Sequence, residues 1–175
     1  MNYSSIRSMD ITNGEGIRVS LFVSGCNFHC HNCFNKEAQD YNNGKPFTKE
    51  TYTQICELLK RPYIAGLSLL GGDPLCQDDE GFYYMNHLAL CAHSLGKDTW
   101  LWTGFKWEDI WRTSYITGVG LLRQNLVGLC DVIVDGQYID SLRDPSLKWR
   151  GSSNQRVILS HMSLGQEQPI LMEGT

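Results

Sequence analysis

Three cysteines lie close together in the chain, at Cys26, Cys30 and Cys33, with the spacing C-x3-C-x2-C. This spacing puts three soft thiolates on one short segment, residues 25–35, which we call the cysteine loop. Thiolates are the usual ligands of iron–sulfur clusters, and a cubane cluster held entirely by protein uses four of them. Three ligands leave one metal position open, as they do at catalytic zinc sites. The spacing therefore predicts a metal centre that can bind a further molecule.

A structural zinc site is the main alternative for these residues. His29, His31 or Cys76 could then supply the fourth ligand. Structural zinc is usually held by two separated pairs of ligands, and the sequence contains no second pair. A disulfide framework is less favoured still, because the chain has seven cysteines and we recognise no secretory signal.

Length and composition predict one domain over residues 1–160, followed by a loosely held C-terminal tail, residues 161–175. The hydrophobic share is 42%, the charged share is 19% and the net charge is −4, with no run rich in Lys or Arg. We therefore expect neither nucleic acid nor a membrane as a partner. No segment approaches the roughly 20 apolar residues of a membrane span. We expect a cytoplasmic protein, whose thiols stay reduced.

Strand and helix patterns alternate along the chain after a polar N-terminal segment, residues 1–16, which ends in a turn-prone loop, Asn13-Gly14-Glu15-Gly16. Residues 40–47 also have the composition of a loop. The predicted strands are 17–24, 66–70, 99–103, 131–135 and 156–159. The predicted helices are 49 to about 60, capped by Thr48, then 79 to about 95, a short one carrying Trp107 and Trp111, and one around 121–129.

This alternation predicts an α/β fold with a parallel sheet of about five strands and outer helices. The chain is too short for a complete eight-stranded barrel, which needs ~250 residues, so we expect a partial, open β/α barrel. Ligand sites of such folds gather where parallel strands end. The cysteine loop follows the first predicted strand, and a Gly-Gly-Asp-Pro turn at residues 71–74 follows the second.

The cysteines belong to a longer motif: Gly14-x-Gly16-x-Arg18-x3-Phe22-x2-Gly25-Cys26-x3-Cys30-x2-Cys33-x-Asn35. This motif resembles the signature of glycyl-radical-enzyme activating proteins, a branch of the radical S-adenosyl-L-methionine superfamily. The resemblance implies that Cys26, Cys30 and Cys33 hold a [4Fe–4S] cluster and act through it, with S-adenosyl-L-methionine chelating the free iron. One electron would cleave this cofactor to methionine and a 5′-deoxyadenosyl radical. The protein would orient and shield the reaction.

The resemblance also assigns residues to the cofactor. Asn32 to Phe34 would border its adenine, because many relatives place an aromatic residue just before the last cysteine. Read alone, Gly71-Gly72-Asp73-Pro74 is most often a tight turn. Read with the cysteine loop, it resembles the Gly-Gly-acidic motif of the superfamily, whose carbonyls would accept hydrogen bonds from the ammonium group, with Asp73 adding negative charge.

Residues 144–155 (DPSLKWRGSSNQ) resemble the C-terminal segment of the members that activate anaerobic (class III) ribonucleotide reductases. Arg150 and residues 152–154 could contact the cofactor or the partner. The resemblance implies an oxidoreductase whose protein substrate is the large reductase subunit, which would lose a hydrogen atom from one glycine, and whose electrons come from a flavodoxin-type donor. Two alternatives remain open: activation of another glycyl radical enzyme, such as pyruvate formate-lyase, and a non-catalytic, zinc-stabilised binding module.

Overall fold

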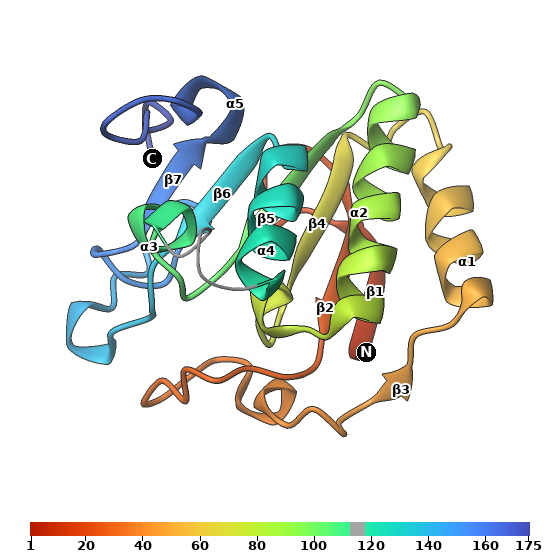
Figure 1. Ribbon diagram of the computed structural model, residues 1–175, viewed down its shortest axis with the longest axis horizontal. Coiled ribbons are helices and arrows are strands. Elements are labelled where there is room, and N and C mark those ends of the chain that lie inside the picture. Colours follow the sequence, from red (N-terminus) through yellow and green to blue (C-terminus); the bar gives the residue numbers. More distant parts are fainter. Residues whose placement is uncertain (113–117) are drawn as a thin grey trace.

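The computed structural model describes residues 1–112 and 118–175, which form a mixed α/β fold around one open sheet (Figure 1). The sheet has seven strands in the order β3-β1-β2-β4-β5-β6-β7. Their bounds are β1 Asn2–Asp10, β2 Arg18–Val23, β3 Lys45–Pro46, β4 Gly66–Gly71, β5 Asp98–Trp102, β6 Val132–Asp135 and β7 Arg156–Leu159. The helices are α1 Lys49–Leu59, α2 Asp79–Ser94, α3 Trp107–Arg112, α4 Gly118–Leu129 and α5 Ser160–Ser163.

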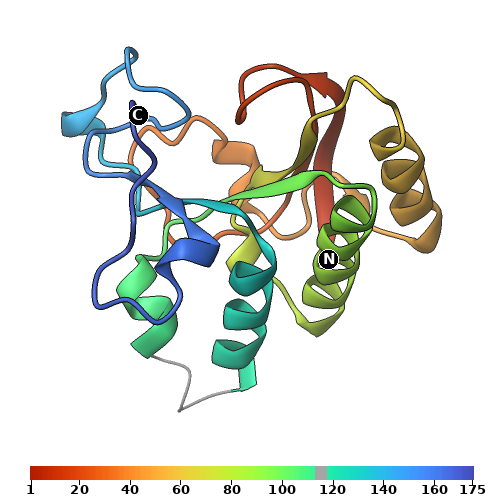
Figure 2. The same ribbon diagram turned by 90° about the horizontal axis from the view of Figure 1, so that it is seen from above.

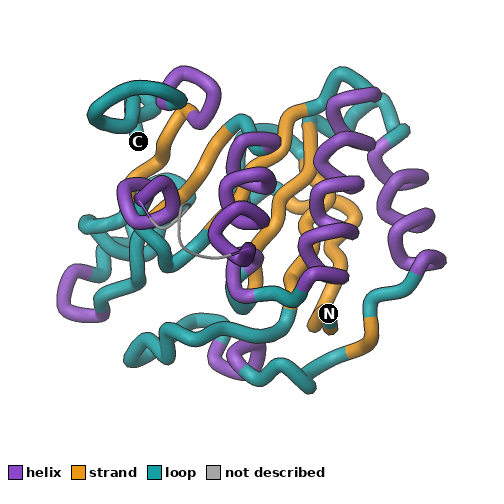
Figure 3. The backbone as a smooth tube through the Cα atoms, in the orientation of Figure 1, coloured by secondary structure: helices purple, strands orange, loops and turns teal. Residues whose placement is uncertain are grey.

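The central strands β2, β4, β5 and β6 are parallel, while β1, β3 and β7 pair in antiparallel fashion with their neighbours. Helices α1, α2 and α4 cover one face of the sheet (Figures 1 and 2). The loops that follow β2 and β6 lie along the same edge of the sheet, where the parallel strands end (Figure 3). This edge therefore gathers the segments in which the sequence predicts the site.

The predicted helices form for the reasons that the sequence suggests, namely N-terminal caps and apolar faces. The Thr48 side chain accepts from the backbone N–H of Thr51 and begins α1, whose Ile55 and Leu59 are fully buried. Asp78 caps α2 in the same way, at Gly81. These helices bury their apolar faces against β2, β4 and β5 in one core that includes Leu21, Leu67, Leu69, Phe82, Met85, Leu88 and Leu101. No helix in the described part of the chain is long and apolar enough to cross a membrane.

The sequence predicts no strand in the polar segment 1–16, but residues 2–10 form β1. This strand pairs with β2, and its outer face is exposed, so polar residues such as Ser5 and Arg7 conceal the strand pattern. Residues 45–46 of the predicted 40–47 loop form β3. The sheet thus has seven strands instead of about five. Strand β7 is antiparallel because residues 136–155 return along the same edge without a crossover helix.

The C-terminal tail is held more firmly than expected. The N–H of Leu159 donates to the carbonyl of Ile170 (2.9 Å), and the N–H of Met172 donates to that of Val157 (2.8 Å). Met172 also packs against the cluster around Trp100. The expectation of a loose segment is therefore wrong for its final part, because it pairs with the free edge of β7.

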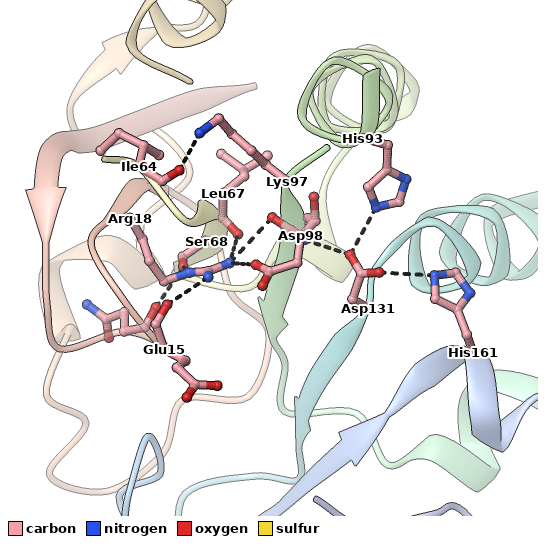
Figure 4. A network of polar contacts seen from close by, with 12 residues as sticks. Glu15, Arg18, Ile64, Leu67, Ser68, His93, Lys97, Asp98, Asp131 and His161 are labelled. Carbon is pink, nitrogen blue, oxygen red and sulfur yellow. Dashed lines mark hydrogen bonds and ion pairs between the residues drawn. The ribbon is translucent and has the colours of Figure 1, made fainter. Parts of the chain in front are cut away.

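A polar network lies where the parallel strands begin, on the edge opposite the cysteine loop (Figure 4). Fully buried Arg18 donates to the Ser68 hydroxyl (2.7 Å), the Leu67 carbonyl (2.8 Å) and Asp98. Nearby, His93 and His161 each contact one oxygen of the Asp131 carboxylate, at 2.9 and 3.3 Å. Arg18, a member of the sequence motif, therefore joins the strand beginnings instead of lining the site.

Candidate functional site

The cysteine loop begins at a tightly bonded junction between β2 and β4. The N–H of Gly72 donates to the carbonyl of Val23 (2.7 Å), and the N–H of Asp73 donates to that of Gly25 (2.8 Å). On the other side of the loop, the N–H of Cys26 donates to the carbonyl of Gln39 (3.1 Å). The backbone before the first cysteine is thus fixed by neighbours on both sides.

Glycine is required at this junction for two different reasons. Gly71 has a φ of +114°, a conformation that other residues rarely adopt. Gly72 has an ordinary φ, but a Cβ there would lie 2.5 Å from the carbonyl oxygens of Ala38 and Gly25. The side-chain amide of Asn35 donates to the carbonyl of Gly71 (3.2 Å), which joins the far end of the cysteine loop to the same turn.

A cavity of about 830 Å³ lies between the loops that follow β2, β4, β5 and β6. All residues predicted to hold the cluster or to contact the cofactor from the two motifs are on its wall: Cys26, Cys30, Asn32, Cys33, Phe34, Gly71, Gly72 and Asp73. Of the four further candidates, Arg150 lines the cavity, whereas Ser152, Ser153 and Asn154 do not. Trp102, Trp149 and Arg150 line the same cavity. The fold therefore brings segments that are more than a hundred residues apart to one concave surface.

The three thiols are free and partly exposed on this wall. The N–H of Cys33 donates to the carbonyl of Cys30 (3.2 Å), and His29 and Asn32 adopt positive φ angles of 49° and 53°. His and Asn tolerate this left-handed conformation better than most residues. The loop is therefore folded into tight turns that leave its thiols accessible from the cavity.

The thiols differ in environment. A hydrogen bond with the Cys76 thiol is the main cause that lowers the pKa of Cys26, whereas burial is the main cause that raises the pKa of Cys30. Among residues 1–112 and 118–175, no three His, Cys, Asp or Glu side chains form a ready-made site for a single metal ion. A cubane cluster is a different case, because each thiolate binds a different iron atom. Three thiols spread along one cavity wall fit that group.

Asp73 is bound by protein donors. Only 1% of the residue is exposed. Its carboxylate accepts from the N–H groups of Leu75 and Gly104 (2.8 Å each) and from the Thr103 hydroxyl (3.0 Å). Burial raises the pKa of Asp73 to about 6. The side chain therefore joins the end of β4 to the end of β5, and both of its oxygens accept from protein donors.

The two residues predicted near the adenine differ in their surroundings. The Asn32 side-chain amide donates to Asp140 (3.0 Å), so Asn32 is already engaged. Phe34 is 95% exposed, and its ring is open to a ligand or to a partner surface. Their contact with adenine stays a prediction.

Several residues that support the site carry no signal in the sequence. Gln77 donates to the carbonyls of Ser24 (3.1 Å) and Asp73 (3.0 Å), beneath the junction. The Tyr41 hydroxyl donates to the carbonyl of Cys76 (3.1 Å), and its ring packs on Gly25. Both side chains bind backbone carbonyls. Because every residue has a carbonyl, the sequence carries no signal for these bonds, and only the tertiary structure identifies them.

The polar segment 144–155 folds beside the cavity. Arg150 lies on the wall and donates to the carbonyl of Gln155 (2.8 Å). The Trp102 indole donates to the carbonyl of Trp149 (2.7 Å), and Trp149 has a φ of 60°. Ser152 is fully buried, and its hydroxyl accepts from the N–H of Ile139 (3.2 Å). Arg150 thus lies on the cavity wall, while Ser152 supports the segment.

Comparison with known proteins agrees with this geometry. Residues 12–158 match the family model described as "4Fe-4S single cluster domain". A protein of Escherichia coli K12 named anaerobic ribonucleoside-triphosphate reductase-activating protein is 41% identical over 159 residues, which cover 90% of this chain and 97% of that protein. Proteins with the same name are 40% identical in Enterobacteria phage T4 (90% and 93% covered) and 35% identical in Haemophilus influenzae (90% and 97% covered).

Proposed function

Because the chain belongs to the family of anaerobic ribonucleoside-triphosphate reductase-activating proteins and carries a 4Fe–4S single cluster domain, we propose that it activates such a reductase by generating a glycyl radical on its large subunit. One observation carries the proposal. The three thiols of the C-x3-C-x2-C motif and the Gly-Gly-Asp turn line the same cavity, although the motif follows β2 and the turn lies at the end of β4.

In this proposal Cys26, Cys30 and Cys33 would hold a [4Fe–4S] cluster, and the turn at Gly71 and Gly72 would bind S-adenosyl-L-methionine. With both bound, the reduced cluster would supply the electron that cleaves this cofactor to methionine and a 5′-deoxyadenosyl radical, and the radical would take a hydrogen atom from a glycine α-carbon. The turn is suited to the ammonium group, because glycine lets a ligand approach backbone carbonyls closely. Phe34 provides an exposed ring beside the adenine.

The remaining parts of the proposal concern the electron donor, the location and the domain. A flavodoxin-type protein supplies the electron, and the protein works in the cytoplasm. Residues 1–160 act as a single radical S-adenosylmethionine domain with residues 161–175 as its C-terminal segment, and the sheet curves as a partial, open barrel. An open side suits a protein substrate, because a glycine in an extended segment can enter a narrow cavity without a side chain.

The test is anaerobic reconstitution with iron and sulfide, followed by addition of S-adenosyl-L-methionine and a reductant. We expect about four iron and four sulfide per chain, release of 5′-deoxyadenosine, and a glycyl radical signal in electron paramagnetic resonance when the large reductase subunit is added. Cys33→Ala should abolish the product, whereas Cys56→Ala, on the outer helix α1, should retain it. One zinc per chain without sulfide would refute the cluster, and a radical formed only on pyruvate formate-lyase would refute the substrate.

A further inference from the structure

Residues 137–140 cross from β6 to the cysteine loop and contact it along its length. The side-chain amide of Gln137 donates to the carbonyl of Phe28 (3.1 Å). Asp140 accepts from the side-chain amide of Asn32 (3.0 Å). These two bonds join segments that are more than a hundred residues apart in the sequence.

The segment also lies beside the thiols. Tyr138 and Asp140 line the same cavity as Cys30 and Cys33. The carbonyl that accepts from Gln137 belongs to Phe28, two residues before Cys30, so this bond fixes the backbone that leads to the middle cysteine of the motif.

Asp140 is itself held in place. One carboxylate oxygen accepts from the Tyr138 hydroxyl (2.8 Å), the other accepts from Asn32, and the ring of His31 lies 3.8 Å from the second oxygen. The Tyr138 hydroxyl and, after it, the Asn32 amide keep the pKa of Asp140 below its usual value. Asn32 has a positive φ and directly precedes Cys33, so the direction of its side chain is coupled to the turn that carries the last cysteine.

We propose that residues 137–140 form a clamp that positions the cysteine loop, with Asp140 acting through Asn32 and Gln137 acting through the Phe28 carbonyl as positioning residues. The consequence for cluster retention rests on the function proposed above, but the effect on the loop does not. Without the Asp140 carboxylate, Asn32 and the turn before Cys33 lose their anchor. The loop then opens more often, with or without a cluster.

The first experiment uses the full-length, cluster-free chain. Alkylation of Cys30 and Cys33 by iodoacetamide is followed by peptide mass spectrometry in wild type, Asp140→Ala, Asn32→Ala and the double variant. Each single change should accelerate alkylation of Cys33 several-fold. The double variant should alkylate at the rate of the single variants, because all of them remove the same hydrogen bond. Asp140→Asn keeps one acceptor oxygen and should lie in between.

Asp144→Ala is the matched control, because this carboxylate lies four residues after Asp140, outside the clamp, and accepts from the N–H and hydroxyl of Ser146 (2.9 and 2.6 Å). It should alkylate like the wild type. Circular dichroism reports whether each variant is folded, and if Asp140→Ala is not, the Asp140→Asn rate decides. Wild-type rates in the Asp140 variants, or equal acceleration by Asp144→Ala, would overturn the clamp.

The second experiment uses the reconstituted protein. Asp140→Ala and Gln137→Leu should each release iron to a chelator several-fold faster than Asp144→Ala, because each removes one of the two bonds that hold the loop. Iron release from Gln137→Leu at the Asp144→Ala rate would overturn the Gln137 part of the proposal. If the wild type takes up no iron and sulfide, the proposed function fails, and the alkylation rates still decide whether the clamp exists.

Discussion

Substitution of Gly72 by alanine tests how the cysteine loop is positioned. In the structure, a Cβ at this residue would lie 2.5 Å from the carbonyl oxygens of both Ala38 and Gly25, and 2.9 Å from the carbonyl carbon of Gly25. Ordinary contacts of such an atom begin at 3.4 Å, so the backbone must separate by about 0.9 Å. Gly25 directly precedes Cys26, and the first cysteine has to move with it.

The expected loss of stability depends on which atoms must move to make room for the new methyl group. Inserting a methyl group into a packed site costs about 1–3 kcal/mol. The upper half of that range applies here, because the groups in contact with the new methyl are backbone carbonyls that cannot rotate away. In a domain of this size, about 2 kcal/mol corresponds to a decrease in Tm of about 4–8 °C. We also expect a lower iron content after reconstitution, because the displacement reaches Cys26.

Urea unfolding and iron analysis measure the two effects separately. Gly128→Ala is the matched control, because this glycine lies in α4 and a Cβ there meets no atom within 4 Å. Alanine is the better helix residue, so this control should gain about 0.5–1 kcal/mol and keep its iron. If Gly72→Ala unfolds at the wild-type urea concentration and binds as much iron, the steric argument for the Gly-Gly turn is wrong.

Two further substitutions test buried charges. Burial raises the pKa of Asp73 from the usual 3.8 to about 6. The protonated side chain therefore contributes its full stabilisation below pH 3.8, and this contribution is lost as the pH rises through 6. Between pH 4 and 8 the free energy of unfolding of the wild type should fall by about 2 kcal/mol relative to that of Asp73→Asn in urea unfolding, and parallel pH profiles would contradict this. Arg156→Ala leaves Asp135 buried without its ion pair and should lower the free energy of unfolding by about 3 kcal/mol. Lys60→Ala breaks an exposed ion pair and should cost much less, so equal costs in chemical denaturation would show that burial is irrelevant.

Much of the secondary structure could be predicted, because local patterns cause it. The Thr48 cap, the buried strand at 66–71 and the short helix beginning at Trp107 all appear where the sequence indicates. Strand β1 could not, because its polar outer face follows from its place beside β2, which no local pattern reveals. The firm attachment of the C-terminal segment is a similar case, since it depends on the free edge of β7.

The site divides along the same line. The chemistry of the cysteine loop was determined by residue type and spacing alone, because a thiolate is a metal ligand wherever it lies and C-x3-C-x2-C keeps three of them within reach. Tertiary structure decided what surrounds these thiols. In the folded chain the carboxylate of Asp73 joins two strands, and Asp140 and Gln137 bind the loop from more than a hundred residues away in the sequence. Such contacts depend on how strands are ordered in the sheet, and that order is set by packing of the whole chain.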